Sequence, residues 1–224
     1  GTASNYVGFG SHYVLKDNVP YYGSRGNIQP GDLKFKDLNG DGVIDAKDQT
    51  VIGRGLPIHT GGFGNNFSYK GFSLNIFFQW SYGNDIINAY RFLLDGGLAS
   101  GGNQFADYTN RWTPTNMNTD IPRIGGGVLA APAGIIYSSR MVEDGSYLRL
   151  KTVNLTYSIP SFLLKRTGFK SCSVYISGQN LITWTKYTGQ DPEVSGYNSV
   201  LTPGFDWSAY PRARTYVIGA NLSF

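Results

Sequence analysis

The sequence predicts an all-β fold built from antiparallel strands of a membrane β-barrel. Three observations support this fold class: side chains alternate between apolar and polar with a period of two, long and short connections alternate between the strands, and the C-terminal strand ends on Phe224. Aromatic residues and charged residues each make up 15% of the chain, whereas an ordinary soluble domain is about 25% charged.

The period of two defines six candidate strands. In Gly71–Tyr82 one side carries Phe72, Leu74, Ile76, Phe78, Trp80 and Tyr82, and the other side is mostly polar, with Phe77 as the exception. The candidates are the weak segment Tyr6–Leu15, then His59–Lys70, Gly71–Tyr82, Ser146–Ser158, Ser171–Trp184 and Arg214–Phe224. β-Branched and aromatic residues, which favour strands, are frequent in them. Only a segment near Ile86–Leu94 has the pattern of a short helix.

The connections between these strands follow the order long, short, long, short, long. The shortest is a tight turn at Tyr69–Gly71, and the others include the long segments before His59, before Ser146 and before Arg214. Long loops without structure of their own are uncommon in compact soluble domains, but barrels of the outer membrane alternate short turns with long loops. A half-buried strand of a soluble sandwich alternates in the same way, so the loop pattern, and not the alternation, favours the barrel.

Several classes of function find no support in the composition. The formal net charge is +4 and no Lys/Arg run occurs, so we expect no nucleic-acid partner. The single cysteine, Cys172, excludes an internal disulfide. We expect neither a spanning helix nor a signal peptide. His12 and His59 lack an obvious nucleophile, and Asp191 and Glu193 are interpreted as solvated loop carboxylates, so we expect no enzyme.

The segment Asp37–Asp48, DLNGDGVIDAKD, has the spacing of a calcium loop of EF-hand type. Its predicted ligands are Asp37, Asn39, Asp41, the backbone carbonyl of Val43, Asp45 and Asp48. Asp48 stands where an EF-hand has a bidentate glutamate, as in loops that resemble the dockerin type. The ion would be a structural Ca²⁺ that holds a long loop in place. The alternative is a loop of Asx turns without metal, since Asp, Asn and Gly favour turns.

Five motifs occur in an order that resembles one family. They are PGDLKFKDLNGDGVIDAKDQTVIG (Pro30–Gly53), RWTPTNMNTDIPR (Arg111–Arg123), SSRMVEDGSYLRLKTVNLTYSIP (Ser138–Pro160), GQNLITWTKYTGQDPEV (Gly178–Val194) and YPRARTYVIGANLSF (Tyr210–Phe224). Together they resemble the C-terminal part of a TonB-dependent outer-membrane transporter of the SusC/RagA family of Bacteroidota. The resemblance covers almost the whole chain from Gly31 onwards.

The resemblance implies that residues 1–224 form the C-terminal portion of a transmembrane barrel of about 22 strands, with a plug in its lumen. About six strands cannot close such a pore, so the chain would be part of a longer polypeptide whose N-terminal plug and TonB box lie elsewhere. The implied location is the bacterial outer membrane, with lipid around the barrel. The implied partners are TonB and a SusD-like surface lipoprotein, and the implied function is import of oligosaccharides or peptides.

The resemblance also implies a direction for the chain. The final strand of such barrels ends at the periplasmic side, which places Asp37–Asp48 on the cell surface. The alternating residues Tyr216, Ile218, Ala220, Leu222 and Phe224 resemble the signal that the barrel-assembly machinery reads. An alternative interpretation of the whole chain is a secreted, calcium-stabilised all-β module that binds carbohydrate or acts as an adhesin.

Overall fold

The computed structural model divides into two compact units, and each is described by itself. One unit is Gly1–Gly53 with Ile87–Val142, and the other is Arg54–Ile86 with Glu143–Phe224. The residues described are 5–9, 12–23, 25, 28–89, 91, 103–123, 138–165, 168–194, 202–207 and 209–224. No helix among these residues is long and apolar enough to cross a membrane.

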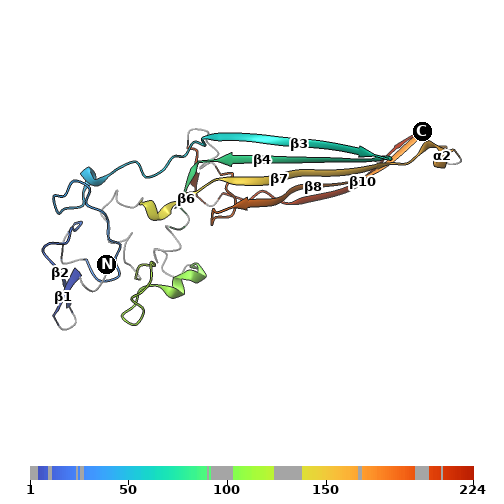
Figure 1. The fold of residues 1–224 in the computed structure, drawn as a ribbon. Coiled ribbons are helices and arrows are strands. Elements are labelled where there is room, and N and C mark those ends of the chain that lie inside the picture. Colours follow the sequence, from blue (N-terminus) through green and yellow to red (C-terminus); the bar gives the residue numbers. More distant parts are fainter. Residues whose placement is uncertain are drawn as a thin grey trace. The chain divides into compact units, whose positions relative to one another are not determined.

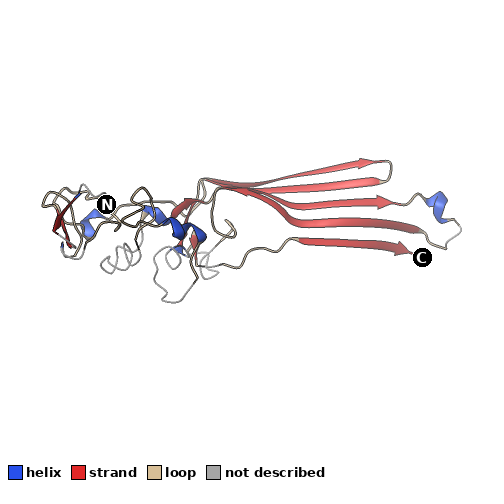
Figure 2. Ribbon diagram, turned by 90° about the horizontal axis from the view of Figure 1, so that it is seen from below, coloured by secondary structure: helices blue, strands red, loops and turns tan. Residues whose placement is uncertain are grey.

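The second unit contains a five-stranded antiparallel sheet in the order β10-β8-β7-β4-β3. Its strands are β3 (His59–Tyr69), β4 (Phe72–Tyr82), β7 (Tyr147–Ser158), β8 (Ser171–Thr185) and β10 (Thr215–Ser223). They match five of the six predicted strands. Figures 1 and 2 show them as a single long layer. Each strand pairs with the next of the five along the chain, so the sheet is a meander.

The connections confirm the predicted alternation of long and short. The turn between β3 and β4 is formed by Lys70 (φ 44°) and Gly71 (φ 86°), the left-handed region where glycine is favoured. The connection from β7 to β8 holds only the short helix α2 (Ser161–Leu164) in its described part. Both short connections and the C-terminus lie at one end of the sheet (Figure 1). We call this the turn end and the opposite end the loop end.

Two irregularities in register keep the faces of the sheet consistent. Lys151 of β7 has no counterpart on β4, because Phe77 pairs with Thr152 and Phe78 with Leu150. On β8, Asn180 adopts φ 53°, and its side-chain amide donates to the carbonyl of Ala213 at 3.1 Å. A bulge inserts one residue and would otherwise reverse the faces beyond it. Bulges at neighbouring positions on adjacent strands therefore leave apolar side chains opposite apolar side chains along the whole sheet.

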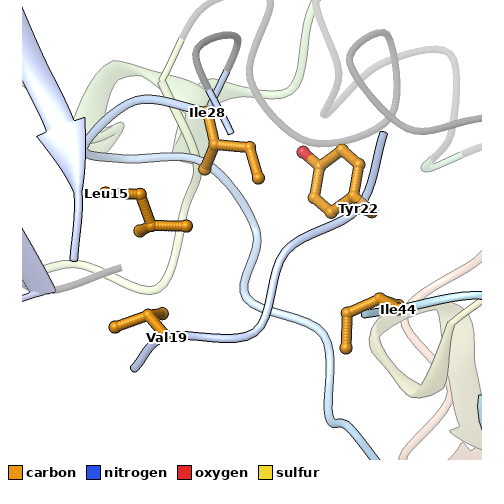
Figure 3. Close-up of a cluster of buried hydrophobic side chains, with 5 residues drawn as sticks. All are labelled: Leu15, Val19, Tyr22, Ile28 and Ile44. Carbon is orange, nitrogen blue, oxygen red and sulfur yellow. The ribbon is translucent and has the colours of Figure 1, made fainter. Parts of the chain in front are cut away.

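The first unit is built around a small apolar core. Leu15, Val19, Tyr22, Ile28 and Ile44 are buried together (Figure 3), and Tyr22 meets the ring of Phe35 edge to face, with the ring centroids 5.4 Å apart. Segment Tyr6–Leu15, predicted as one strand, is instead a hairpin of β1 (Tyr6–Phe9) and β2 (His12–Leu15) that forms its own two-stranded sheet. Four-residue strands are too short to cross a bilayer, which takes about 9–11 residues.

The remaining elements are short. A three-stranded sheet has the order β6-β5-β9, formed by β6 (Val142–Asp144), β5 (Asp85–Asn88) and β9 (Phe205–Asp206). Three 3₁₀ turns are η3 (Ala46–Asp48), η4 (Ala106–Asn110) and η5 (Ser139–Met141). The helix predicted near Ile86–Leu94 is wrong at its start, because Ile86–Asn88 pair as a strand. Ala89 and Arg91 are helical, as predicted, and residues 90 and 92–94 lie outside the described part.

Candidate functional site

One face of the five-stranded sheet is apolar across all its strands. Residues opposite one another in the register share a face, so Leu74 of β4 and Leu155 of β7 lie beside Ile176 of β8 and Ile218 of β10. Further members are Phe63, Phe67, Phe72, Ile76, Phe78, Leu148, Val153, Tyr157, Val174, Ile182, Trp184 and Leu222. Ile218 is 81% exposed and Leu222 is 50% exposed. Soluble proteins rarely expose an apolar surface of this extent.

The opposite face is polar but almost free of charge. From the level of Thr152 and Gln179 to the turn end, the strand residues described on this face include no Asp, Glu, Lys, Arg or His. Its side chains are Ser, Thr, Asn and Gln with a few aromatics and glycines and with Val217 of β10, and Asn75 donates to Asn66 across β4 and β3 at 2.6 Å. A face of this kind suits water or a hydrogen-bonding protein surface, in contrast to the apolar face behind it.

Phe77, the sequence's exception on the polar face, has a packing partner. It pairs with Gly64 on β3, and its ring also lies over Gly62, where an added Cβ would come within 2.7 Å of the ring. Tyr175 covers Gly219 on β10 in the same way. Glycine in a strand leaves room for close approach of a neighbour. These aromatic side chains therefore fill the space that glycine leaves on the adjacent strand.

A buried ion network lies on the polar face at the loop end. Arg149 of β7 is 2% exposed and donates from Nη2 to Asp191 and from Nη1 to Glu193 at 3.2 Å. Glu193 also meets Lys151 at 3.5 Å and Arg212 Nε at 3.0 Å. Three cations and two carboxylates thus tie β7 to the loop after β8 and to the segment before β10. Such networks hold a loop in one arrangement only while every member is present.

The network corrects one prediction. Asp191 was expected to be a solvated loop carboxylate, but it is 6% exposed and accepts hydrogen bonds from Arg149, from the backbone N–H of Glu193 at 2.9 Å and from that of Arg212 at 3.1 Å. Burial raises the pKa of Asp191, but these hydrogen bonds outweigh it and leave the pKa below its ordinary value. The sequence signal for this network is the acidic motif GQDPEV together with the basic residues Arg149 and Lys151 on a strand of alternating side chains.

The acidic loop Asp37–Asp48 is organised by its own carboxylates. Asp37 accepts from the N–H groups of Gly40 at 2.6 Å and Gly42 at 2.8 Å, and Asp41 accepts from the N–H of Val43 at 2.9 Å. Asp45 and Asp48 form a capping box around η3. Glycines at 40 and 42 have φ values of 79° and 82°, which permits the two sharp turns.

The loop is fixed to the core of the first unit at one point. Tyr21 pairs with Val43 in a short parallel bridge, in which the N–H of Ile44 donates to the carbonyl of Tyr21 at 2.8 Å. Ile44 itself is buried in the core. The C-terminal half of the loop is therefore held against the core. In the N-terminal half, Asn39 and Asp41 are exposed and Asp37 is half-buried.

The donor set of this loop fits calcium, because it consists of carboxylate and amide oxygens. In the described residues, however, no three side chains of the Asp, Glu, His and Cys types come together as a metal cluster. Hydrogen bonds from the backbone N–H groups of Asp45 and Leu38 lower the pKa of Asp48, so this carboxylate is charged at neutral pH. The chemistry of the ligands agrees with the prediction, and calcium binding stays a prediction.

The proposed assembly-signal residues lie on the edge strand β10. Tyr216, Ile218 and Leu222 project on the apolar face with Ala220, and Phe224, just beyond β10, packs against Phe169 with ring centroids 5.2 Å apart. Among the residues that the structure describes, this strand pairs with β8 on one side only. Cys172 of β8, opposite Leu222, is a free thiol of intermediate exposure.

Asp191→Asn should open the loop after β8. The change removes the more buried of the two carboxylates that pair with Arg149 and leaves only Glu193, and breaking a buried ion pair costs about 3 kcal/mol. We expect faster hydrogen exchange at the amides of Glu193 and Arg212, measured by mass spectrometry on the full-length protein. Asp107→Asn, which alters an exposed carboxylate of η4, is the matched control.

The same pair predicts a pH dependence. Because the folded pKa of Asp191 is lowered, its stabilisation is complete above the unfolded pKa of about 3.9 and is lost as the pH falls through the folded value. The wild-type loop should therefore open only below about pH 4, while the Asn variant opens at every pH. Equal opening of both proteins at neutral pH would show that the network does not hold the loop.

Comparison with known proteins identifies the family of this chain. No model of a known protein family matches the chain. TonB-dependent receptor P3 of Formosa agariphila is 41% identical over 204 residues, which cover 89% of this chain and 20% of the receptor. TonB-dependent receptor SusC of Bacteroides thetaiotaomicron is 28% identical over 200 residues, 88% of this chain and 18% of SusC. The chain thus spans about a fifth of the length of the curated relatives it matches.

Solved structures agree with the sequence relatives. The RagAB peptide transporter matches with a TM-score of 0.67 at 29% identity, covering 98% of this chain and 22% of that one. The RagAB peptide importer in its closed-closed state matches with a TM-score of 0.66 at 30% identity, with the same coverage. By its motifs, its two-faced sheet and these relatives, the chain belongs to the TonB-dependent receptors of the SusC/RagA type.

Proposed function

We propose that this chain forms part of the barrel wall and of the surface loops of an outer-membrane transporter that imports oligosaccharides or peptides. The transporter would work with a SusD-like lipoprotein and would draw on TonB through segments that lie in the rest of the protein. The relatives are named as receptors and transporters, and we propose no enzymatic activity.

The observation that carries this proposal is the single-layer sheet with one apolar face and one polar face that carries charge only at the loop end among the described strand residues. A soluble sandwich would cover the apolar face with a second sheet, but Ile218, Leu222 and Ile176 are exposed. In lipid, the same exposure is favourable, and the polar face meets a wet interior. The secreted β-module is therefore the weaker candidate for this chain.

The edges of the sheet support the same proposal. Strands β3 and β10 each pair on one side only among the described residues. Unpaired backbone groups in hydrocarbon cost several kcal/mol each, so both edges need further strands. Because the chain covers about a fifth of its relatives, the remaining part of a longer transporter can supply them and close the barrel.

The transport proposal is tested with the full-length protein in bacterial cells. We expect the protein in the outer-membrane fraction, with gel migration that shifts on heating as folded barrels do. Uptake of labelled oligosaccharides or peptides should require both TonB and the neighbouring lipoprotein. A protein that stays soluble and monomeric without detergent would contradict the barrel, and uptake that is independent of TonB would contradict the energy source.

We also propose that Asp37–Asp48 binds a structural Ca²⁺ on the cell surface. Two features support this: the hard-oxygen donors recur at the spacing of a calcium loop, and the loop is joined to the core through Ile44 alone among the loop's buried residues. Asp37, Asn39, Asp41, the Val43 carbonyl, Asp45 and Asp48 would hold the ion. The bound charge would offset the mutual repulsion of four carboxylates within twelve residues.

Asp41→Ala tests the calcium site. Since the number of charged ligands sets calcium affinity, we expect binding at least about tenfold weaker by calorimetry, together with faster proteolysis within residues 37–48. Membrane insertion and heat-shifted migration should not change. Asp107→Ala removes an exposed carboxylate outside the loop and serves as the control. Unaltered calcium binding by the Asp41 variant would remove the ion from the account.

A further inference from the structure

An aromatic groove lies on the apolar face at the loop end of the sheet. It has a volume of about 590 Å³ and is lined by residues of five strands, β3, β4, β6, β7 and β8, and by the start of the loop after β8. Its lining includes Trp80, Leu148 and Trp184 together with His59, Tyr82 and Lys186. All of them belong to the second unit. The groove is shallow and open on one side.

The strand register gives the groove its shape. Leu148 of β7 pairs directly with Trp80 of β4 on one side and with Trp184 of β8 on the other. Neighbouring strands are about 4.8 Å apart, so Trp80 and Trp184 belong to strands about 10 Å apart, with Leu148 on the strand between them. The indole of Trp80 lies over Gly61 of β3. The result is a trough with an apolar floor, continuous with the rest of the apolar face. Its width and chemistry suit a hydrocarbon chain.

Some polar groups around the groove have hydrogen-bond partners within the protein, and others remain available to a ligand. Asp144 accepts the N–H of Ser146 at 2.9 Å, Ser146 Oγ accepts the N–H of Gly83 at 3.0 Å, and Thr185 Oγ1 donates to the carbonyl of Ser146 at 2.9 Å. The carboxylate and hydroxyls nearest the groove therefore each have a hydrogen-bond partner within the protein. Asp144 keeps its negative charge, because its pKa is lowered by hydrogen bonds from Ser146.

The groups that remain available include two hydrogen-bond donors, His59 and Lys186. Trp80 Nε1 donates to His59 Nδ1 at 3.1 Å, so in the neutral imidazole the proton lies on Nε2, which becomes a donor. Stacking on Tyr82, with ring centroids 5.1 Å apart, holds the imidazole in place. Lys186 is exposed and forms no ion pair within the described residues, and its charge acts on the carboxylate of Asp144 in the same groove. A cation and an N–H donor thus stand at the polar end of an apolar trough.

We propose that this groove binds a membrane lipid with a phosphate headgroup, whose acyl chain lies over Leu148 between Trp80 and Trp184 and whose phosphate meets Lys186 and His59. The charge of Lys186 complements the phosphate, and the trough is continuous with the face that meets hydrocarbon. The inference rests on the proposed insertion of that face in the outer membrane, and it adds a specific lipid at a defined place on it.

The experiment uses the full-length transporter in detergent micelles, titrated with phosphatidic acid and followed by native mass spectrometry. Diacylglycerol with the same acyl chains, which lacks only the phosphate, is the matched ligand. We expect phosphatidic acid to bind and diacylglycerol to bind more weakly. Lys186→Ala should weaken phosphatidic acid about fivefold and leave diacylglycerol unchanged, whereas Trp184→Ala should weaken both about tenfold.

Two control variants keep the test specific. Lys170→Ala removes the same charge near the turn end, and Phe67→Ala removes an aromatic side chain from the apolar face outside the groove. Heat-shifted migration of every variant reports barrel insertion, so its loss would indicate failure of the barrel and not of the lipid site. Intact insertion with equal lipid binding by Lys186→Ala and Lys170→Ala, or by Trp184→Ala and Phe67→Ala, would overturn the inference.

Discussion

Pairing of every backbone N–H and C=O between strands, with hydrocarbon on one side of the sheet, is the constraint on which the rest of the structure depends. In lipid, no water is available to replace a missing partner. The strands must therefore be long, regular and joined in a meander, and their side chains must alternate strictly. The bulges at Lys151 and Asn180 illustrate this requirement. A one-residue shift in the register of a strand would turn its apolar side chains beyond that point to the wet side.

The same constraint separates the chemistry along the strands. Within the described sheet, charge on the polar face is concentrated at the loop end, where Arg149 and Lys151 meet the carboxylates of the following loop. Between these residues and the turn end, the described strand residues of the polar face are uncharged. This ion network stabilises the loop after β8, which has little apolar core. The acidic loop of the first unit also has little apolar core, and hydrogen bonds to its own carboxylates stabilise it in part.

Much of this could be predicted from the sequence because alternation is a local property. The five long strands and the turn at Tyr69–Gly71 follow from residue patterns alone. The sequence predicts a single strand where the structure has the hairpin Tyr6–Leu15, because four-residue strands leave no clear period. Asp191 was misjudged because its partner Arg149 is 42 residues away in sequence, and only the register brings them together. The aromatic groove likewise depends on register, since Trp80 and Trp184 are distant in the chain.

Lipid contact of alternate residues on β10 is the most direct test of the account. Ile218 and Val217 are adjacent and point to opposite faces, so each is replaced by cysteine in the full-length protein after Cys172→Ser and labelled with a fluorophore. A quencher carried on lipid acyl chains should quench the label at position 218 and leave the label at position 217 bright. Equal quenching at both positions, or stronger quenching at 217, would show that the two-residue alternation does not separate hydrocarbon from a wet interior.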